Sequence, residues 1–346
     1  MTTVYVTHPR FIEHRLTHYN HPERPERLET IWRCLDEAKL TERLLCLQPE
    51  RLVEQRWMEA VHTPELLDLL QWTSEQKKVV MIDADTYALP TSYEIARLAA
   101  QGTLVAIDSI MQGKAANGLV ALRPPGHHAT ASRPMGFCLL NNVAIAARYL
   151  QQQYGLKKVM IVDFDVHHGN GTQDIFYADP SVLFVSLHQY PYYPGSGGMR
   201  ETGTGAGKGA TLNIPLSGGY TDAHYVRFFR EVIAPLAVRF QPDFLLVSAG
   251  YDAHWRDPLA DMRLSLTGYA YLSRELLSIA QTHCGGRLLF VQEGGYDLEA
   301  IGYGMRNAAH VLLGEDEIAD PLGADPEPVV RDASPLIAQL QALHQL

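Results

Sequence analysis

Short apolar runs rich in β-branched residues alternate along this chain with longer segments of helical periodicity. Runs of this kind are typical of buried strands, whereas apolar residues spaced three and four apart indicate helices. Because strands that alternate with helices form crossover units, the order favours a mainly parallel sheet with helices on both faces. The predicted strands are 3–7, 119–122, 159–163, 182–187, 244–248 and 288–291. The predicted helices include 93–111, 142–154, 222–239, 267–283 and 299–313.

We expect a single α/β domain over residues 1–346, because no repeat, low-complexity linker or abrupt change of composition divides the chain. Hydrophobic residues make up 46% of the chain and charged residues 20%, which is enough apolar material for one large core. The acidic, proline-bearing stretch 314–335 is predicted to be a surface excursion before a last short helix, with a frayed tail as the alternative.

The formal net charge of −10 argues against nucleic acid as a partner, since the long-range field of the protein repels phosphates. It is compatible with a cationic substrate such as a lysine-rich peptide or a polyamine. The glycine-rich stretch 194–210 contains Lys208 but lacks the spacing of a phosphate-binding loop, so a mobile loop is predicted there.

The cysteine pattern and the hydropathy of the chain bear on its compartment. The four cysteines are widely spaced and form no CxxC pair, which favours a reducing compartment. The first residues lack the apolar stretch of a signal peptide, and no run is long enough to span a membrane. We therefore predict a cytoplasmic protein with no membrane partner, and the sequence leaves open whether it forms a homo-oligomer.

Polar clusters follow four of the predicted strands, where parallel sheets of this class bind ligands. RPPGHHA follows 119–122, and FDVHHGNGT follows 159–163. AGYDAHWRDP comes after 244–248, and QEGGYD comes after 288–291. Four clusters at four strand ends predict one shared pocket.

The segment DFDVHHGNG has the pattern of a metal site. In an extended chain, residues two apart face the same side, so Asp163, Asp165 and His167 line one face. Carboxylate oxygens and histidine nitrogens bind zinc, and a catalytic zinc has three protein ligands with one position open. Asp252, at another strand end, is the candidate third ligand; structural hydrogen bonding is the alternative.

Two histidines and a tyrosine are candidates for acid-base chemistry and oxyanion stabilisation. His127 and His128 follow a stiff Pro-Pro-Gly turn, so that one can abstract a proton from water while the other donates a proton or tunes charge. Tyr296 follows two glycines and can donate its hydroxyl to an oxyanion. The alternatives are a structural histidine pair and a packing tyrosine.

The segments RPPGHHA, GFCLLNN, DFDVHHGNGT, SLHQYPYYPGSG, AGYDAHWRDPL and EGGYD, in this order within 17–313, resemble the histone deacetylase family, which has the arginase/deacetylase fold. The resemblance implies a zinc-dependent hydrolase of linear amide bonds that removes acetyl or other acyl groups from the ε-amine of lysine. The ligands of the one catalytic zinc would be Asp165, His167 and Asp252. The acid/base pair would be His127 and His128, and Tyr296 would polarise the substrate carbonyl.

Further roles are implied only by the resemblance. Asp163 would orient His127 and, with Ser186 and the Leu187 carbonyl, bind a structural potassium ion. Asn170 would be the partner of His128; together with RPPGHHA and EGGY it is more similar to the class II branch, which has bacterial deacetylases and acetylpolyamine amidohydrolases as relatives, than to class I.

The same resemblance suggests how substrate is recognised. Gly126 would contact the substrate, and Phe137 and Tyr193 would be the aromatic walls of the lysine channel, with core packing as the alternative. Arg27 would line the exit path of the carboxylate product, unless it forms a surface ion pair. Leu259 stands where polyamine-specific relatives carry a glutamate, which favours lysine substrates.

Three other functions compete with this interpretation. The first is an acetylpolyamine or other small-molecule amidohydrolase on the same scaffold. The second is a non-catalytic acyl-lysine binding module, although each expected catalytic residue is present in the sequence. The third is an arginase-like manganese hydrolase, for which the sequence offers no second set of metal-binding carboxylates and histidines.

Overall fold

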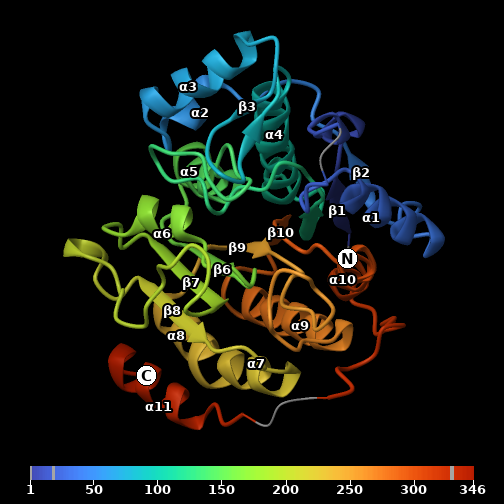
Figure 1. Ribbon diagram of the computed structural model, residues 1–346. Helices are drawn as coiled ribbons and strands as arrows, with labels where there is room; N and C mark the ends of the chain where they lie inside the picture. The colour runs from blue at the N-terminus through green and yellow to red at the C-terminus, as the bar shows by residue number, and fades with distance from the viewer. Residues whose placement is uncertain (1, 18–19, 328–330) are drawn as a thin grey trace.

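The computed structural model describes residues 2–17, 20–327 and 331–346, and its centre is an eight-stranded sheet in the order β2-β1-β5-β10-β9-β6-β7-β8 (Figure 1). Each neighbouring pair in this sheet is parallel, so the predicted α/β fold is confirmed. The strands are β1 Thr3–Val6, β2 Leu45–Leu47, β5 Asn117–Val120, β6 Val159–Asp163, β7 Val182–Gln189, β8 Thr211–Leu216, β9 Phe244–Ala249 and β10 Leu288–Gln292. A separate antiparallel pair consists of β3 Val80–Met81 and β4 Tyr87–Ala88.

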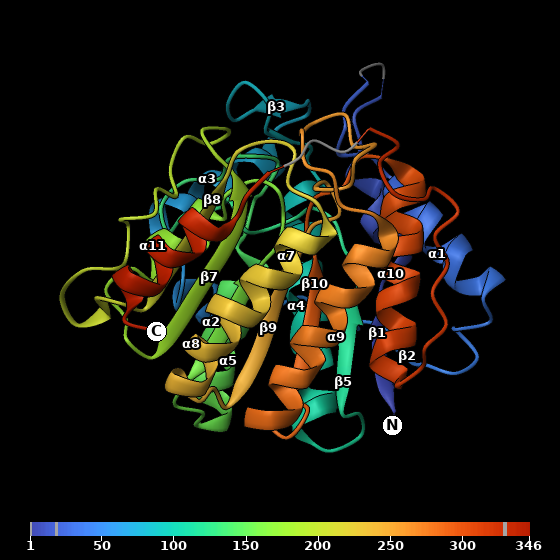
Figure 2. The same ribbon diagram turned by 90° about the horizontal axis from the view of Figure 1, so that it is seen from below.

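Helices cover both faces of the sheet, as Figures 1 and 2 show. One layer contains α2 Gln55–Glu59, α3 Pro64–Glu75, α4 Ser92–Met111 and α5 Asn142–Tyr154. The opposite layer contains α1 Glu26–Glu37, α7 Asp222–Phe228, α8 Ala234–Phe240, α9 Leu266–His283, α10 Leu298–Leu313 and α11 Ser334–His344. The short α6 Asn170–Phe176 precedes β7, and 3-10 turns occupy Pro9–Glu13 and Gly205–Gly207. None of the helices in the described part of the chain combines the length and hydropathy that a membrane span requires.

The predicted elements agree with the structure to within about two residues, apart from one interrupted helix. The predicted helix 222–239 consists of α7 and α8 joined by a π-helical turn at Phe229–Ile233. The structure also adds elements that the sequence did not predict, including both edge strands of the sheet. β2 is only three residues long, and β8 contains Asn213 and Pro215, which are uncommon in strands except at an edge.

The stretch 314–335 runs over the surface before α11, and residues 328–330 of it lie outside the described part. Asn307 of α10 holds it through a reciprocal pair of hydrogen bonds with the backbone of Ala319, at 2.8 and 3.0 Å. The indole of Trp255 donates to the carbonyl of Gly323 at 2.9 Å. Side chains on the body of the domain therefore anchor its described part.

The strand order explains why polar residues far apart in sequence meet. β5, β10, β9 and β6 are consecutive in the sheet, and they are the four strands whose carboxyl ends carry the polar clusters. Their register places Val120, Val291, Ser248 and Asp163 in one row, which Ser186 of β7 continues. The four clusters consequently leave the sheet side by side.

Close packing at the centre of the sheet yields a stability prediction. A Cβ atom added at Gly118 of β5 would lie 2.4 Å from Cγ1 of Val4 and 2.9 Å from its carbonyl oxygen. A Cβ atom added at Gly102 of α4 would have its nearest neighbour, Cγ1 of Val6, at 3.4 Å, which is an ordinary contact. We expect Gly118→Ala to lower the free energy of unfolding by about 1–3 kcal/mol through overpacking. Gly102→Ala should raise it by up to about 1 kcal/mol because alanine favours helix. Urea denaturation of both variants checks this, and equal effects would contradict it.

Candidate active site

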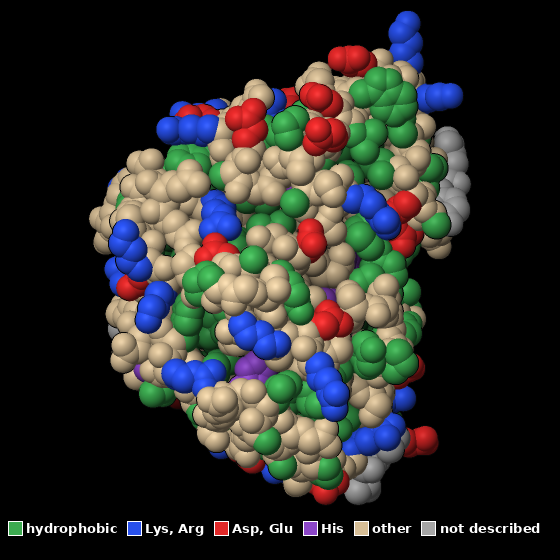
Figure 3. Space-filling model, turned by 90° about the vertical axis from the view of Figure 1, so that its left-hand side faces the viewer, with side chains coloured by type: hydrophobic (Ala, Val, Ile, Leu, Met, Phe, Trp, Pro, Cys, Tyr) green, Lys and Arg blue, Asp and Glu red, His purple; other side chains and the backbone are tan. Residues whose placement is uncertain are grey.

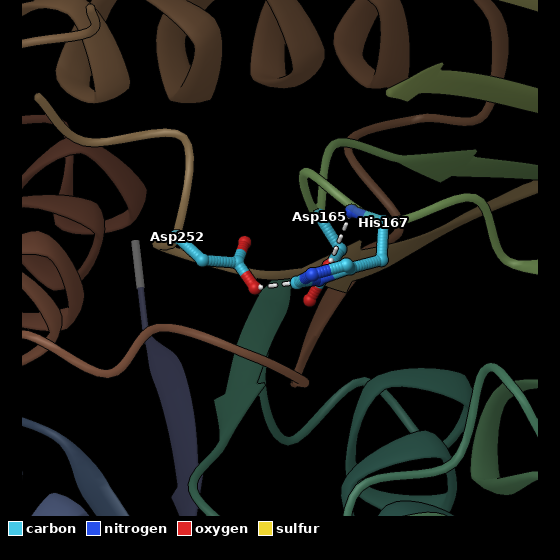
Figure 4. A group of neighbouring side chains, drawn as sticks. All are labelled: Asp165, His167 and Asp252. Atoms are coloured by element: carbon cyan, nitrogen blue, oxygen red, sulfur yellow. Dashed lines mark hydrogen bonds and ion pairs between the residues drawn. The ribbon is translucent and has the colours of Figure 1, made fainter. Parts of the chain in front are cut away.

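Two carboxylates and one imidazole converge at the carboxyl edge of the sheet. The ligand atoms of Asp165, His167 and Asp252 all lie within 4.8 Å of one another (Figure 4). Nδ1 of His167 is 3.2 Å from Oδ1 of Asp165 and 3.3 Å from Oδ2 of Asp252. That Asp252 oxygen is buried and accepts no hydrogen bond from the described residues. The three side chains therefore fit the oxygen and nitrogen donor set that zinc prefers.

The backbone packs closely against the side chains of Asp165 and Asp252 and donates hydrogen bonds to both. Oδ1 of Asp252 accepts the Val166 N–H at 2.9 Å, and Oδ2 of Asp165 accepts the Gly294 N–H at 2.7 Å. A Cβ at Gly294 would lie 2.1 Å from Oδ2 of Asp252, so glycine is required there. Burial, with the charge of Asp165, raises the pKa of Asp252. A bound cation would offset this repulsion between the two carboxylates.

The two predicted histidines have different partners. Nδ1 of His127 lies 3.0 Å from Oδ2 of Asp163, and Nδ1 of His128 lies 2.7 Å from Oδ1 of Asn170. An amide oxygen only accepts, so His128 carries its proton on Nδ1 and keeps the lone pair on Nε2. The partners predicted for both histidines are thus in contact with them.

The protonation states of the pair differ as well. Burial lowers the pKa of His127, but the charges of Asp163 and Asp165 outweigh burial and raise it to about 10. Burial, then the positive charge of His127, lowers the pKa of His128 well below its usual value. His127 is therefore the protonated member at neutral pH, and His128 is the neutral one.

A cavity of about 280 Å³ opens above the histidines. Its lining includes the predicted residues His128, Phe137, His167, Tyr193, Leu259 and Tyr296. Phe137 and Tyr193 therefore face the cavity, which goes against the core-packing alternative. Phe137 adopts φ 68°, an uncommon conformation for phenylalanine, and its N–H donates to Oγ1 of Thr86 at 3.1 Å.

Three further residues line this cavity and were not predicted: Asp85, Gly136 and Tyr192. Tyr192 and Gly136 lie within or next to quoted segments, so proximity to Tyr193 and Phe137 could have indicated them. Asp85 belongs to the connection between β3 and β4, and nothing in the sequence places that hairpin at the cavity.

Tyr296 is held by its backbone and by the guanidinium of Arg27. Its N–H donates to Oδ2 of Asp257 at 2.7 Å, and the Arg27 guanidinium carbon is 5.0 Å from its ring centroid. Burial raises the pKa of Tyr296 well above its usual value, which keeps the hydroxyl protonated. Asp257 also accepts the Leu259 N–H at 3.0 Å. One buried carboxylate thus positions both residues at the cavity.

Arg27 is fully buried, so the alternative of a surface ion pair is wrong. It donates to the carbonyl of Gly295 at 2.7 Å and to that of Glu293, and it pairs with Glu23 at 3.2 Å. Arg27 does not line the cavity. Its role in product exit stays a prediction.

Gly126 lies behind the histidine pair and not in the cavity lining. Its N–H donates to Oε2 of Glu293 at 2.6 Å, and the His127 N–H donates to the same oxygen at 3.2 Å. A contact between Gly126 and substrate stays a prediction, whereas Glu293 is a structural anchor that was not predicted.

The residues expected to hold a monovalent cation are neighbours in the sheet. Asp163 of β6 is paired with Ser186 of β7, and Leu187 follows Ser186. Oδ1 of Asp163 accepts the Asp165 N–H at 3.1 Å, while Oγ of Ser186 is 2.9 Å from Nδ1 of His188.

The sequence and the fold of this chain are similar to those of known proteins of one family. Residues 21–312 match the family model described as "Histone deacetylase domain". The chain is 44% identical over 272 residues to "Histone deacetylase 14, chloroplastic" of Arabidopsis thaliana. This match covers 75% of this chain and 64% of the relative, so the chain spans just under two thirds of the relative's length. It is 39% identical over 346 residues to the "Probable deacetylase" of Archaeoglobus fulgidus, covering 99% of this chain and 95% of the relative. A solved structure described as "Crystal Structure of HDA15 HD domain" is similar with a TM-score of 0.90 and 37% identity, covering 99% of this chain and 94% of that one.

The buried acid that supports Arg27 generates a second prediction. Glu23 pairs with Arg27 and Arg123, so Glu23→Ala leaves two buried guanidinium groups without their carboxylate. We expect the free energy of unfolding to fall by about 3–5 kcal/mol. Glu13→Ala, which removes one of the two carboxylate partners of the partly exposed Arg10, should cost less than about 1 kcal/mol.

The same ion pair sets a pH dependence. Burial raises the pKa of Glu23, but Arg123 outweighs burial and lowers it to about 2, from its usual value of 4.5. Stability from a lowered acid pKa is present above the unfolded value and is lost as pH falls through the folded value. The difference between parent and Glu23→Ala should therefore shrink below about pH 4.5. A difference that stays constant down to acid unfolding would contradict the assignment.

Proposed function

The chain belongs to the histone deacetylase family, and from this premise we propose that it is a zinc-dependent deacetylase of lysine side chains. It would hydrolyse the amide bond of N-ε-acyl-lysine and release a carboxylate and free lysine. The observation that carries the proposal is the convergence of Asp165, His167 and Asp252 beside a histidine pair, next to a cavity that His167 lines together with aromatic side chains.

Asp165, His167 and Asp252 would hold the zinc and leave a coordination position open for substrate. When bound there, zinc polarises a carbonyl and lowers the pKa of a neighbouring water. Oδ2 of Asp252 is buried and accepts no hydrogen bond from the residues that the structure describes, which supports this assignment.

The histidine pair would move protons. His128 is neutral with its lone pair on Nε2, so it can accept a proton from the attacking water. His127 is kept positive by Asp163, which favours negative charge developing on the substrate. The pair then returns a proton to the departing amine of lysine, and water is the only co-substrate.

The cavity walls would position the acyl-lysine. Phe137 and Tyr193 can enclose an alkyl stem while the peptide end stays in water. Tyr296, with a protonated hydroxyl, can donate to the oxyanion that forms on the carbonyl. We also propose that Asp163, Ser186 and the Leu187 carbonyl hold a structural potassium ion, since β6 and β7 bring them together.

An acetylpolyamine is the second candidate substrate, and Asp85 at the cavity favours it because a carboxylate there would attract a cationic chain. Leu259 in the same lining favours an acetyl-lysine peptide, because it stands where polyamine-specific relatives carry a glutamate. Comparing kcat/KM for an acetyl-lysine peptide and acetylspermidine separates the two. The cytoplasmic location stays a prediction, because the Arabidopsis relative carries "chloroplastic" in its name.

A third prediction concerns the ligand set. Asp252→Ala should abolish hydrolysis of an acetyl-lysine peptide and bound zinc together, because two remaining protein ligands hold zinc poorly. Elemental analysis and an acetate-release assay measure both quantities. Asp316→Ala, which removes a fully exposed carboxylate, should keep zinc and activity. Full zinc occupancy in Asp252→Ala would remove Asp252 from the ligand set.

A fourth prediction concerns Tyr296→Phe, which removes one hydroxyl and keeps the ring. Losing an oxyanion donor should lower kcat by about 10²- to 10³-fold while zinc content is unchanged. Tyr192→Phe is the matched control, because Tyr192 lines the same cavity without an assigned proton or oxyanion role. A kcat for Tyr296→Phe within about threefold of the parent would refute its catalytic role.

A further inference from the structure

A second cavity lies between the loop after β7 and the carboxyl-terminal helix α11, and its volume is about 880 Å³. It shares no residue with the cavity above the histidine pair. Arg200 and Lys208 reach it from the loop, Arg239 comes from the end of α8, and His344 comes from the end of α11. We call these four residues the basic groove.

In the described part of the chain, the cations of the basic groove have no acidic partner. Within the described ranges, none of Arg200, Lys208 and Arg239 lies within ion-pair distance of a carboxylate, whereas Arg148 of α5 pairs with Asp179 at 2.6 Å. The chain as a whole has a net charge of −10, so a cluster of unpaired cations is unexpected on its surface. The side of the molecule that Figure 3 presents has several Lys and Arg side chains gathered around a histidine on its lower half.

His344 connects this charge to the interior. The residue is 4% exposed, and its Nε2 has no hydrogen-bond partner in the described part of the chain. Its carbonyl accepts a hydrogen bond from Nη1 of Arg239, which restrains that guanidinium at the groove. Burial, followed by the positive charges of Arg239 and Lys208, lowers the pKa of His344 to about 4. The charges of Arg239 and Lys208 therefore both act on the imidazole of His344.

We propose that the basic groove is a binding site for a small phosphorylated molecule that carries two or more phosphate charges. Lys and Arg are the side chains that bind phosphate oxygens, and an unpaired cluster of them offers several charge-assisted hydrogen bonds. The cavity volume is that of a small-molecule site. The negative charge of the remaining surface disfavours a long nucleic acid strand.

This site differs in construction from a phosphate-binding loop. The spacing around Lys208 excludes that motif, and here side chains from the loop, α8 and α11 supply the charge instead of the backbone of one loop. Arg239 is restrained and Thr202, which also lines the groove, is buried, so part of the site is ordered before the ligand arrives.

Calorimetric titration of the zinc-loaded protein with inorganic pyrophosphate tests the proposal, with a hydroxamate present to block the zinc. Arg200→Gln/Lys208→Gln should weaken binding about tenfold or more. Lys77→Gln/Lys78→Gln makes the same change in net charge at exposed lysines elsewhere, so its affinity should stay within about twofold of the parent. The thermal midpoints of both variants establish that they are folded.

Hydrogen exchange locates the binding. Pyrophosphate should slow exchange of the amides of α11 Ser334–His344 in the parent and not in Arg200→Gln/Lys208→Gln. Absence of binding at millimolar pyrophosphate, or an equal loss of affinity in both double variants, would overturn the proposal. Displacement of pyrophosphate by a more tightly bound oligonucleotide would overturn the small-molecule assignment.

Discussion

Two carboxylates that face one another in the interior are the constraint on which the rest of the site depends. Asp165 and Asp252 are both fully buried, and His167 lies between them. Such a pair is stable only where a cation and directed hydrogen bonds offset the repulsion. The N–H groups of Val166 and Gly294 supply the hydrogen bonds, and the converging atoms of Asp165, His167 and Asp252 form a group that could hold the cation.

The sheet delivers these groups because the order of its strands differs from their order in sequence. β10 and β9 lie between β5 and β6, and the turn after β5 crosses this distance to place Nδ1 of His127 3.0 Å from Oδ2 of Asp163 at the end of β6. Glu293 after β10 then joins the two sides, because one of its carboxylate oxygens accepts two N–H groups of the turn that carries His127. The proposed catalytic groups are thereby attached to rigid strands through buried polar contacts, which is the arrangement that precise positioning requires.

The sequence was sufficient to predict the strands that carry chemistry and the residues that meet at their ends. Asp165, His167 and Asp252 could be predicted because each follows an apolar run, and period-two spacing orients the first two. Glu23, Asp257 and Glu293 were not predicted. Their partners are backbone groups or buried arginines, and Glu293 is separated from Gly126 by 167 residues. No local pattern encodes such a contact, and the position of the β3–β4 hairpin that brings Asp85 to the cavity is likewise set by tertiary packing.

Asp257 accepts hydrogen bonds from the backbone of both Tyr296 and Leu259. One of its oxygens accepts the Tyr296 N–H at 2.7 Å, and the other accepts the Leu259 N–H at 3.0 Å. The proposed oxyanion donor and the residue at the cavity that bears on peptide or polyamine preference therefore share one buried anchor. A substitution at Leu259 that shifted its backbone would also move the carboxylate that holds Tyr296. Because a displacement of about 1 Å at a reacting group is costly, we expect a substitution at Leu259 to alter selectivity without lowering turnover only if it leaves the Asp257 contacts intact.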